Sequence, residues 1–275
     1  MTVQDLDTAA YTDDWRQWHR EHEARRADPH GFLAITGRHW LSPEPERFPD
    51  APGTWRAAGD RVTVTLDEGE DLIVDGTPVH GEYTFDPIPE RGNINAVAGD
   101  AVIEVAKRGG HLIVRPRHPD HPTRTGYNGT AAYDPDPRWA LTGRYVPFAE
   151  PRPVTVGAVV EGLQHVYESP GEVEFQADGQ TLRLTAFNGQ TPGSLFILFT
   201  DATSGVTTYP ANRSLPVPAP DADGRVTLDF NHAVNLPCAY TEFATCPLPP
   251  AGNRLPVAVE AGEKAPGEKA PTELR

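Results

Sequence analysis

The feature that most constrains this chain is a repeated pattern of short alternating segments separated by tight-turn dipeptides. Three such dipeptides stand between runs in which apolar and polar residues alternate: Asp75-Gly76, Gly109-Gly110 and Asp178-Gly179. Asp-Gly and Gly-Gly readily adopt the positive φ angles that two-residue hairpin turns need. The pattern therefore predicts three β-hairpins, over residues 72–79, 101–117 and 172–187.

Further alternating segments extend this pattern over most of the chain. They predict single strands at 61–66, 154–160, 164–168, 194–200, 206–209, 225–230 and 255–259. The 29 prolines and 25 glycines indicate many turns. No strands alternate with crossover helices, which a parallel sheet would require. We therefore expect a mainly β protein, either an antiparallel β-barrel or a β-sandwich.

One helix is predicted near the N-terminus, over residues 12–28. Thr12 is suited to cap it, and Trp15 and Trp18 are spaced to share one face. The other side chains of this segment are mostly charged, and Asp28-Pro29 ends the pattern. We therefore expect a surface helix with its tryptophans turned inward.

The chain shows no clear domain boundary. We expect one mainly β domain over 12–264 that includes the helix, with a flexible N-terminus over 1–11. Residues 118–150 are the least regular part of this domain. Residues 265–275 belong to an end segment that repeats Gly-Glu-Lys-Ala-Pro and lacks apolar anchors, so a disordered tail is expected.

Charge excludes some classes of partner. The net charge is −15, from 39 acidic and 24 basic residues, and no run of Lys or Arg interrupts the sequence. A nucleic-acid binder needs a basic footprint, so we expect no nucleic-acid partner. A transmembrane helix and a secretory signal are also not apparent, so we expect no membrane and a cytoplasmic location. The expected partner is a small molecule, and we leave a homodimer open.

Three segments carry a resemblance to a known family. They are the C-terminal run DFNHAVNLPCAYTEFATCPLPPAGNRLPVAVEAGEK at 229–264, GFLAITGRHWL at 31–41, and LFILFTDATSGVTTY at 195–209 with Arg213 and Leu215 after it. Together the segments resemble the bacterial domain of unknown function 1684 (DUF1684) family over nearly the whole chain. In the early segment Phe32 stands where the family usually has Trp. The resemblance supports the fold and the position of a site, and implies no chemistry.

A polar cluster directly after the strand at 225–230 is the best candidate for a site. Asp229, Asn231, His232 and Asn235 fall within seven residues and are followed by a proline-rich loop. Functional groups are common on loops that a rigid scaffold holds. The Asn amides could hold a substrate carbonyl. The alternative is that these side chains bond the loop backbone, as Asx turns do.

Asp229 has two candidate catalytic roles, as a general base or as the group that orients one. Tyr209, His165 or His232 would then move protons with it. Each of these residue types is common in acid/base catalysis, but their separation along the chain does not say which of them meets Asp229.

Arginines stand out in so acidic a chain. Arg115 and Arg117 share one face of a predicted strand, and Arg213 lies near the end of another segment. If Arg115 and Arg213 converge, they form a clamp for a carboxylate or phosphate group. The alternative is pairing with internal Asp and Glu side chains. Trp40 and Trp139 are candidates to line the ligand cavity.

The two cysteines, Cys238 and Cys246, leave several interpretations open. They could be reduced core thiols, a disulfide, metal ligands or a nucleophile. Their spacing is not Cys-x2-Cys, so a structural zinc site is weakly supported. His19 and His22 lie on the predicted helix among charged residues, which indicates a solvated surface. We therefore predict no metal site.

No Gly-x-Ser-x-Gly elbow occurs, which disfavours a serine hydrolase of the usual elbow type. No dinucleotide fingerprint or Walker loop occurs either, so no cofactor is expected. The first hypothesis is a cytosolic enzyme acting on a small, anionic organic molecule, as a cofactor-independent hydrolase or acid/base catalyst. The alternative is a non-catalytic β-barrel protein that binds a small molecule. A lesser alternative is a metal or redox protein that uses Cys238 and Cys246.

Overall fold

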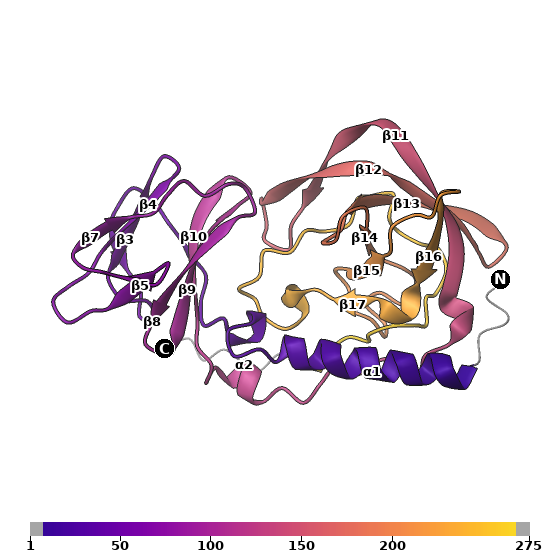
Figure 1. Ribbon diagram of the computed structural model, residues 1–275, viewed down its shortest axis with the longest axis horizontal. Coiled ribbons are helices and arrows are strands. Elements are labelled where there is room, and N and C mark those ends of the chain that lie inside the picture. Colours follow the sequence, from indigo (N-terminus) through magenta and orange to yellow (C-terminus); the bar gives the residue numbers. More distant parts are fainter. Residues whose placement is uncertain (1–7, 268–275) are drawn as a thin grey trace. The chain divides into compact units, whose positions relative to one another are not determined.

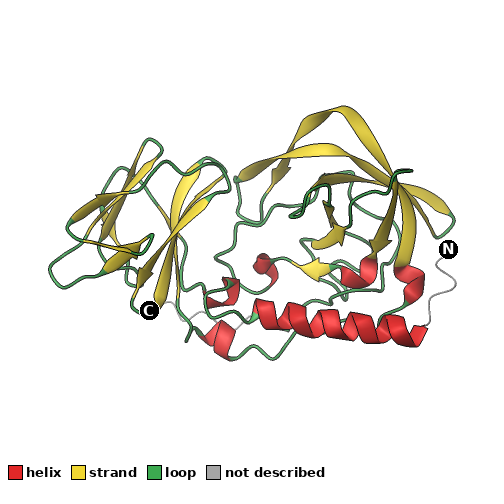
Figure 2. Ribbon diagram, in the orientation of Figure 1, coloured by secondary structure: helices red, strands yellow, loops and turns green. Residues whose placement is uncertain are grey.

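The computed structural model describes residues 8–267 and confirms a mainly β, antiparallel protein (Figure 2). The described chain divides into two compact units. Unit 1 contains the residues up to Glu23, Asn128–Ala239 and the residues from Cys246 onward, and unit 2 contains Ala24–Tyr127 and Tyr240–Thr245. The single domain expected over 12–264 stays a prediction.

Unit 2 is a sandwich of two antiparallel sheets. The first has the order β1 (His39–Trp40), β10 (His111–Arg117), β9 (Ala101–Arg108), β8 (Asn93–Ala98), β5 (Leu72–Val74), β6 (Thr77–Val79). The second has the order β2 (Glu46–Arg47), β3 (Thr54–Ala58), β4 (Arg61–Thr65), β7 (Glu82–Thr84). Apolar side chains of both sheets meet in one core, among them Trp55, Val64, Ile103 and Val114.

Unit 1 is built on one seven-stranded antiparallel sheet. Its order is β16 (Arg225–Asp229), β11 (Ala140–Gly157), β12 (Gln164–Ala177), β13 (Gln180–Asn188), β14 (Leu195–Phe199), β15 (Arg213–Val217), β17 (Val234–Asn235). The register of the long strands β11 and β12 shifts between Pro147 and Arg152. A core that includes Phe175, Phe199 and Phe230 packs on this sheet. Within the described residues, the strand order is open at both ends rather than closed into a barrel.

The three predicted hairpins are confirmed. They are β5–β6, β9–β10 and β12–β13, and each is antiparallel. The turn residues all have positive φ: 49° and 75° at Asp75-Gly76, 57° and 82° at Gly109-Gly110, and 50° and 71° at Asp178-Gly179. The local turn chemistry therefore determined these pairings, as expected.

Two predicted strands, 206–209 and 255–259, are wrong. The apolar alternation of 255–259 is real, since Leu255, Val257 and Val259 are buried in the core of unit 1. Their backbone, however, bonds to a neighbouring loop: the Leu255 N–H donates to the Thr200 carbonyl and the Ala202 N–H to the Val257 carbonyl. The irregular region is also shorter than expected, because β11 begins at Ala140.

The N-terminal helix α1 spans Thr8–Arg26, so it begins earlier than predicted. Thr12 is inside the helix, where its hydroxyl donates to the Thr8 carbonyl instead of capping. Residues 8–11 are helical, and the remainder of the expected flexible N-terminus lies outside the described residues. Trp15 is buried and Trp18 is half-buried, as predicted.

The other helices are single turns: η2 (Phe32–Ala34), α2 (Pro122–Thr125), η3 (Pro137–Trp139), η4 (Phe230–His232) and η5 (Pro237–Ala239). None of the helices within residues 8–267 is long and apolar enough to cross a membrane. Of the expected tail, Ala265 is held by a backbone hydrogen bond to Thr207, and residues 268–275 lie outside the described part.

Candidate acid/base site in unit 1

One face of α1 lies along the turn that follows β16 (Figure 1). Tyr11, Trp15, Trp18 and His22 are spaced by four, three and four residues, which places them in one row on a helix. This row contacts the segment 229–232 and the chain near Glu263. The Trp15 indole N–H, for example, donates to the Asn231 carbonyl at 2.8 Å. The helix and the turn together build a cluster of acidic, phenolic and imidazole groups.

Asp229 is the centre of this cluster. The Tyr11 hydroxyl lies 2.8 and 2.7 Å from its two carboxylate oxygens. Asn231 donates to Oδ1 from its backbone N–H at 3.1 Å and from its amide at 2.9 Å. His232 Nδ1 lies 3.0 Å from Oδ2. With donors around both oxygens, this carboxylate is placed to orient its neighbours, and it also forms the Asx turn that begins η4.

The pKa values of the cluster follow from burial and from these contacts. Burial alone would raise the pKa of Asp229, but the hydrogen bonds and charge of His232 and the Tyr11 hydroxyl outweigh it, so the pKa lies below the usual range. Burial raises the pKa of Tyr11 far above its ordinary value, and the hydrogen bond and negative charge of Asp229 raise it further. At neutral pH the pair is therefore a carboxylate bound by a phenol.

His232 is the group of the cluster that is best placed to exchange a proton. Its Nδ1 faces Asp229, and its ring packs against Trp18 with centroids 4.2 Å apart at 69°. The side chain is 25 % exposed, and its Nε2 has no hydrogen-bond partner among residues 8–267. A carboxylate on Nδ1 fixes the proton there, which leaves the Nε2 lone pair free to act as a base.

A second imidazole–carboxylate pair lies on the same indole. The His22 ring stacks on Trp18 at 5.2 Å and 16°, and His22 Nε2 lies 3.5 Å from Glu263 Oε1. Glu263 is buried, and its Oε2 accepts the Asn235 backbone N–H at 2.7 Å. The expectation that His22 lies on a solvated surface is therefore wrong, because Glu263 and the Trp18 ring cover it.

Gly262 allows Glu263 to reach this position. Its φ is +74°, which side chains other than glycine rarely adopt. A Cβ there would lie 2.5 Å from the Ala233 carbonyl oxygen and 2.7 Å from that of Phe230. Only a glycine therefore lets this segment pass so close to the end of η4.

Arg213, a predicted substrate ligand, is closed inside the protein and 1 % exposed. Its Nη2 donates to Asp201 Oδ2 at 2.9 Å and to the Val259 carbonyl at 3.0 Å, and its Nη1 donates to the Ala261 carbonyl. These bonds hold the segment that carries Glu263. The Asn235 amide has a similar role, since it donates to the Lys264 carbonyl at 2.7 Å.

Asn231 and Trp139 also support the site from within. The Asn231 amide donates to the Tyr11 hydroxyl and to the Asp136 carbonyl, and its oxygen accepts the Asp136 N–H. Asn231 is 1 % exposed, so its amide is occupied by the protein itself. The Trp139 ring packs edge-on against Phe230 with centroids 6.2 Å apart, which anchors η4 to the core.

Of the three predicted proton-transfer partners of Asp229, the structure places His232 against it. The Tyr209 hydroxyl instead donates to the Cys238 carbonyl at 2.8 Å. Burial raises the pKa of Tyr209, and the two nearby cysteines raise it further. His165 is buried in β12, where its ring lies 6.2 Å from that of Tyr167.

Both cysteines are buried. The Cys238 backbone N–H donates to Cys246 Sγ at 3.3 Å, so the two residues are neighbours without a disulfide. Within residues 8–267, no three His, Cys, Asp or Glu side chains are grouped so as to hold a metal ion.

The remaining predicted ligand groups, Arg115 and Trp40, lie in unit 2. Arg115 binds Glu104 through two hydrogen bonds of 3.0 and 2.8 Å. Arg115 and Arg213 thus each pair with a carboxylate of their own unit, which is the internal pairing weighed against a ligand clamp. Trp40 is 36 % exposed and carries the Arg38 guanidinium over its ring at 5.3 Å.

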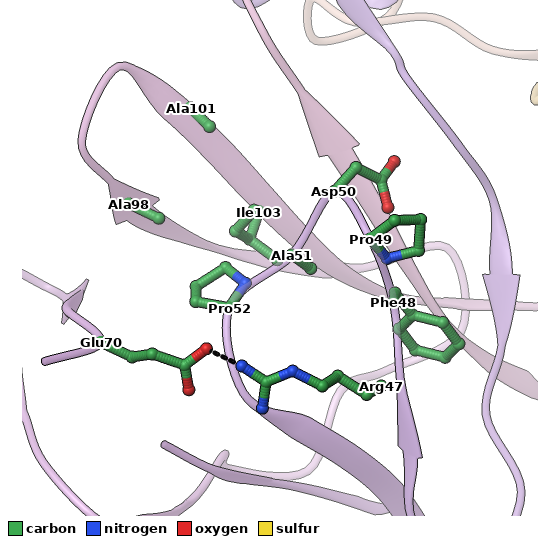
Figure 3. Close-up of a pocket in the computed structure, with 10 residues that line it drawn as sticks. All are labelled: Arg47, Phe48, Pro49, Asp50, Ala51, Pro52, Glu70, Ala98, Ala101 and Ile103. Carbon is green, nitrogen blue, oxygen red and sulfur yellow. Dashed lines mark hydrogen bonds and ion pairs between the residues drawn. The ribbon is translucent and has the colours of Figure 1, made fainter. Parts of the chain in front are cut away.

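Unit 2 also contains an open cavity of about 640 Å³ (Figure 3). Seven of its ten lining residues are apolar: Phe48, Pro49, Ala51, Pro52, Ala98, Ala101 and Ile103. Arg47 and Glu70 form an ion pair at its rim (Figure 3). Asp50 completes the lining, but its carboxylate is bound by His39 and Thr36. No sequence pattern indicated this cavity, because its walls come from separate strands and loops.

Part of the chain is similar to known sequences and to a solved structure. The sequence profile of a family described as protein of unknown function (DUF1684) matches residues 125–264, which include the predicted segments at 195–215 and 229–264. No curated protein matches. A solution NMR structure of an uncharacterized protein of Haloarcula marismortui is 32 % identical, with 51 % of this chain and 78 % of that chain covered and a TM-score of 0.43. The chain belongs to the DUF1684 family of proteins of unknown function.

Proposed function

We propose that Asp229 and His232 form the acid/base centre of an enzyme that acts on a small organic molecule without a cofactor. The observation that carries the proposal is the 3.0 Å contact between Asp229 Oδ2 and His232 Nδ1, with Nε2 on a part-exposed ring. A carboxylate that orients an imidazole in this way is a recurring arrangement of general bases.

In the proposed reaction, His232 Nε2 takes a proton from water or from a substrate hydroxyl as the oxygen attacks the substrate. The imidazolium that results is stabilised by Asp229, which stays ionised because its pKa is depressed. Tyr11 and Asn231 keep the carboxylate in place. His22, on the same Trp18 ring and paired with Glu263, is the candidate to return a proton to the leaving group.

Hydrolysis fits this arrangement because water, a general base and a general acid suffice for it. The anionic character of the substrate and the cytoplasmic location stay predictions from the sequence. Arg213 does not support an anionic substrate at this site, since its guanidinium is occupied inside the protein.

The alternative function, binding of a small molecule without chemistry, is favoured by the cavity of unit 2 (Figure 3). Its volume of about 640 Å³ and its lining, which combines apolar residues with an ion pair, suit a small ligand. A redox role is the lesser alternative, and it is supported by the close approach of Cys246 Sγ to the Cys238 N–H.

The test uses p-nitrophenyl esters of short carboxylic acids as probes of hydrolysis. We expect His232→Gln and Asp229→Asn to lower kcat/KM by about 10²-fold or more, because general-base catalysis contributes roughly that much. His39→Gln is the matched control, since His39 forms a similar pair with Asp50 in unit 2 and should leave the rate unchanged. Equal rates for wild type and His232→Gln would refute the proposal, as would the absence of turnover of every ester.

A further inference from the structure

Unit 2 contains a buried carboxylate that three arginines share. Glu104 is 2 % exposed and accepts two hydrogen bonds from Arg115. It also accepts one from Arg117 Nη2 at 2.5 Å and one from Arg108 Nη2 at 3.1 Å. One carboxylate thus binds three guanidiniums, in a protein whose net charge is −15.

A fourth arginine, Arg38, lies next to this group without a carboxylate of its own. Strands β1 and β10 pair with His39 opposite Val114 and Trp40 opposite Ile113, so Arg38, directly before β1, and Arg115, directly after Val114, lie at the same end of this strand pair. Like charges on neighbouring strands repel each other. The Arg38 Nη1 donates to the Glu242 and Ala244 carbonyls, so its bonds are to backbone oxygens.

The guanidiniums of Arg38 and Arg115 each have a terminal donor nitrogen that makes no hydrogen bond within the described residues. Arg38 uses Nη1 and Arg115 uses Nε and Nη2, so Arg38 Nη2 and Arg115 Nη1 have no partner among residues 8–267. Neither of these two nitrogens is fully buried. The Nε of Arg38, by contrast, is buried and unpartnered.

The electrostatics agree with this geometry. Burial lowers the pKa of Arg38, and the charge of Arg115 lowers it further, while Glu242 offsets only part of the effect. The positive charge between Arg38 and Arg115 is therefore not neutralised by the carboxylates nearby. An anion held between the two guanidiniums would neutralise it.

We propose that Arg38 and Arg115 form a binding site for a small oxyanion, a carboxylate or a phosphate group. Arg38 Nη2 and Arg115 Nη1 would each donate to a different oxygen of the anion, in charge-assisted hydrogen bonds. Glu104 fixes the Arg115 guanidinium, and the Trp40 ring supports that of Arg38. The site lies within unit 2 and does not rest on the acid/base centre proposed for unit 1.

The test is a titration of the full chain with sodium phosphate and with sodium acetate, by calorimetry and by the thermal unfolding midpoint. Sodium chloride at the same ionic strength separates specific binding from screening. The variant is Arg38→Gln, and Arg56→Gln is the matched control, because Arg56 is another arginine of unit 2, 3.6 Å from Glu82.

We expect wild type and Arg56→Gln to show saturable binding of phosphate or acetate, with a midpoint that rises beyond the chloride control. Arg38→Gln should weaken this binding about tenfold or more, since it removes one of the two cationic donors. A response to phosphate alone would assign a phosphate site, and a response to acetate alone a carboxylate site. The proposal is overturned if wild type responds to both salts as it does to chloride, or if Arg38→Gln binds as tightly as wild type. Should Arg38→Gln fail to fold, Arg38→Lys takes its place beside the wild-type titration. Weaker anion binding by Arg38→Lys than by wild type supports the proposal, and binding as tight as that of wild type overturns it.

Discussion

Arg213 in unit 1 and Arg115 in unit 2 are both buried and both bound to a carboxylate, yet their surroundings differ. Arg213 has Asp201 to itself, and backbone carbonyls take its other hydrogen bonds. Arg115 shares Glu104 with Arg108 and Arg117, and its charge also lowers the pKa of Arg38. The comparison teaches that burial of an arginine does not decide its role. An arginine that has a carboxylate of its own indicates a structural ion pair. Several arginines that share one carboxylate leave positive charge for a ligand.

The imidazole–carboxylate pairs of the two units differ in a related way. His39 Nε2 lies 2.7 Å from Asp50 Oδ1, and Thr36 donates to the other oxygen at 2.6 Å. The His39 ring stacks on Phe48, within a loop so tight that a Cβ at Gly37 would lie 2.7 Å from Asp50 Oδ2. The Asp229 pair instead has a phenol and a second imidazole beside it. These additional groups distinguish a candidate acid/base site from the His39–Asp50 pair, which acts as a clamp that holds its loop together.

The largest effect is expected from breaking the Arg213–Asp201 ion pair. Arg213→Met should lower the free energy of unfolding by about 3–5 kcal/mol, because it leaves the Asp201 carboxylate buried without a counter-charge. Urea denaturation followed by tryptophan fluorescence measures this change. Arg183→Met is the control, since Arg183 is an exposed arginine of unit 1 paired with Glu174, and its loss should cost far less than that of Arg213. Equal costs for the two variants would contradict a structural role for Arg213.

The cluster around Glu104 should tolerate the replacement of an arginine by methionine better. Arg115→Met leaves Glu104 with Arg108 and Arg117, and it also removes the repulsion with Arg38. We therefore expect a loss of about 1–2 kcal/mol, well below that of Arg213→Met. The same urea denaturation measures it. A cost as large as that of Arg213→Met would show that the two clusters are energetically alike and would remove the contrast between the units.

Acid titration sharpens the comparison of the two imidazole pairs. Asp229 and Asp50 both have depressed pKa values in the folded protein, so each contributes stability above the unfolded pKa of about 3.9 and loses it as the pH falls through the folded pKa. At pH 7, Asp229→Asn and Asp50→Asn should each cost about 1–2 kcal/mol. Below about pH 4 both differences from wild type should shrink, as the wild-type carboxylates become protonated. A difference that stays constant from pH 7 to pH 3 would contradict the depressed pKa values.

Parts of the site that depend on local sequence could be predicted. Asp229 and His232 are three residues apart on a turn after a strand, so their proximity follows from the chain itself. The pairing of Arg115 with Glu104 was also within reach of the sequence. The two-residue turn Gly109-Gly110 fixes the hairpin register and sets Glu104 opposite Arg115. Applied to this hairpin, that rule favours internal pairing of Arg115 over a clamp with Arg213.

Contacts between distant parts of the chain could not be predicted. Tyr11 and Asp229 are separated by 218 positions, and nothing local links them. The division into two units could not be predicted from the sequence either. Tyr240–Thr245 belongs to unit 2, although the residues on both sides belong to unit 1. The one available signal was the spacing of Tyr11, Trp15, Trp18 and His22 along a single helix face. Four aromatic or imidazole groups in one row indicate a helix face that packs against another part of the protein. The charged residues around them made this pattern hard to recognise.

The smallest expected effect tests whether α1 is part of the site or only packs beside it. Tyr11→Phe removes the hydroxyl that binds Asp229 and keeps the ring, so we expect a loss of about 1 kcal/mol in the free energy of unfolding. The double variant with Asp229→Asn should lose less than the sum of the two single losses, by about 0.5–1 kcal/mol, because the hydroxyl and the carboxylate stabilise each other. Thr12→Val is the matched control on α1, since the Thr12 hydroxyl bonds only within the helix and should not couple to Asp229. If the Tyr11 and Asp229 losses add without coupling, the helix merely covers the turn, and the contrast with the His39–Asp50 clamp then rests on His22 and Trp18 alone.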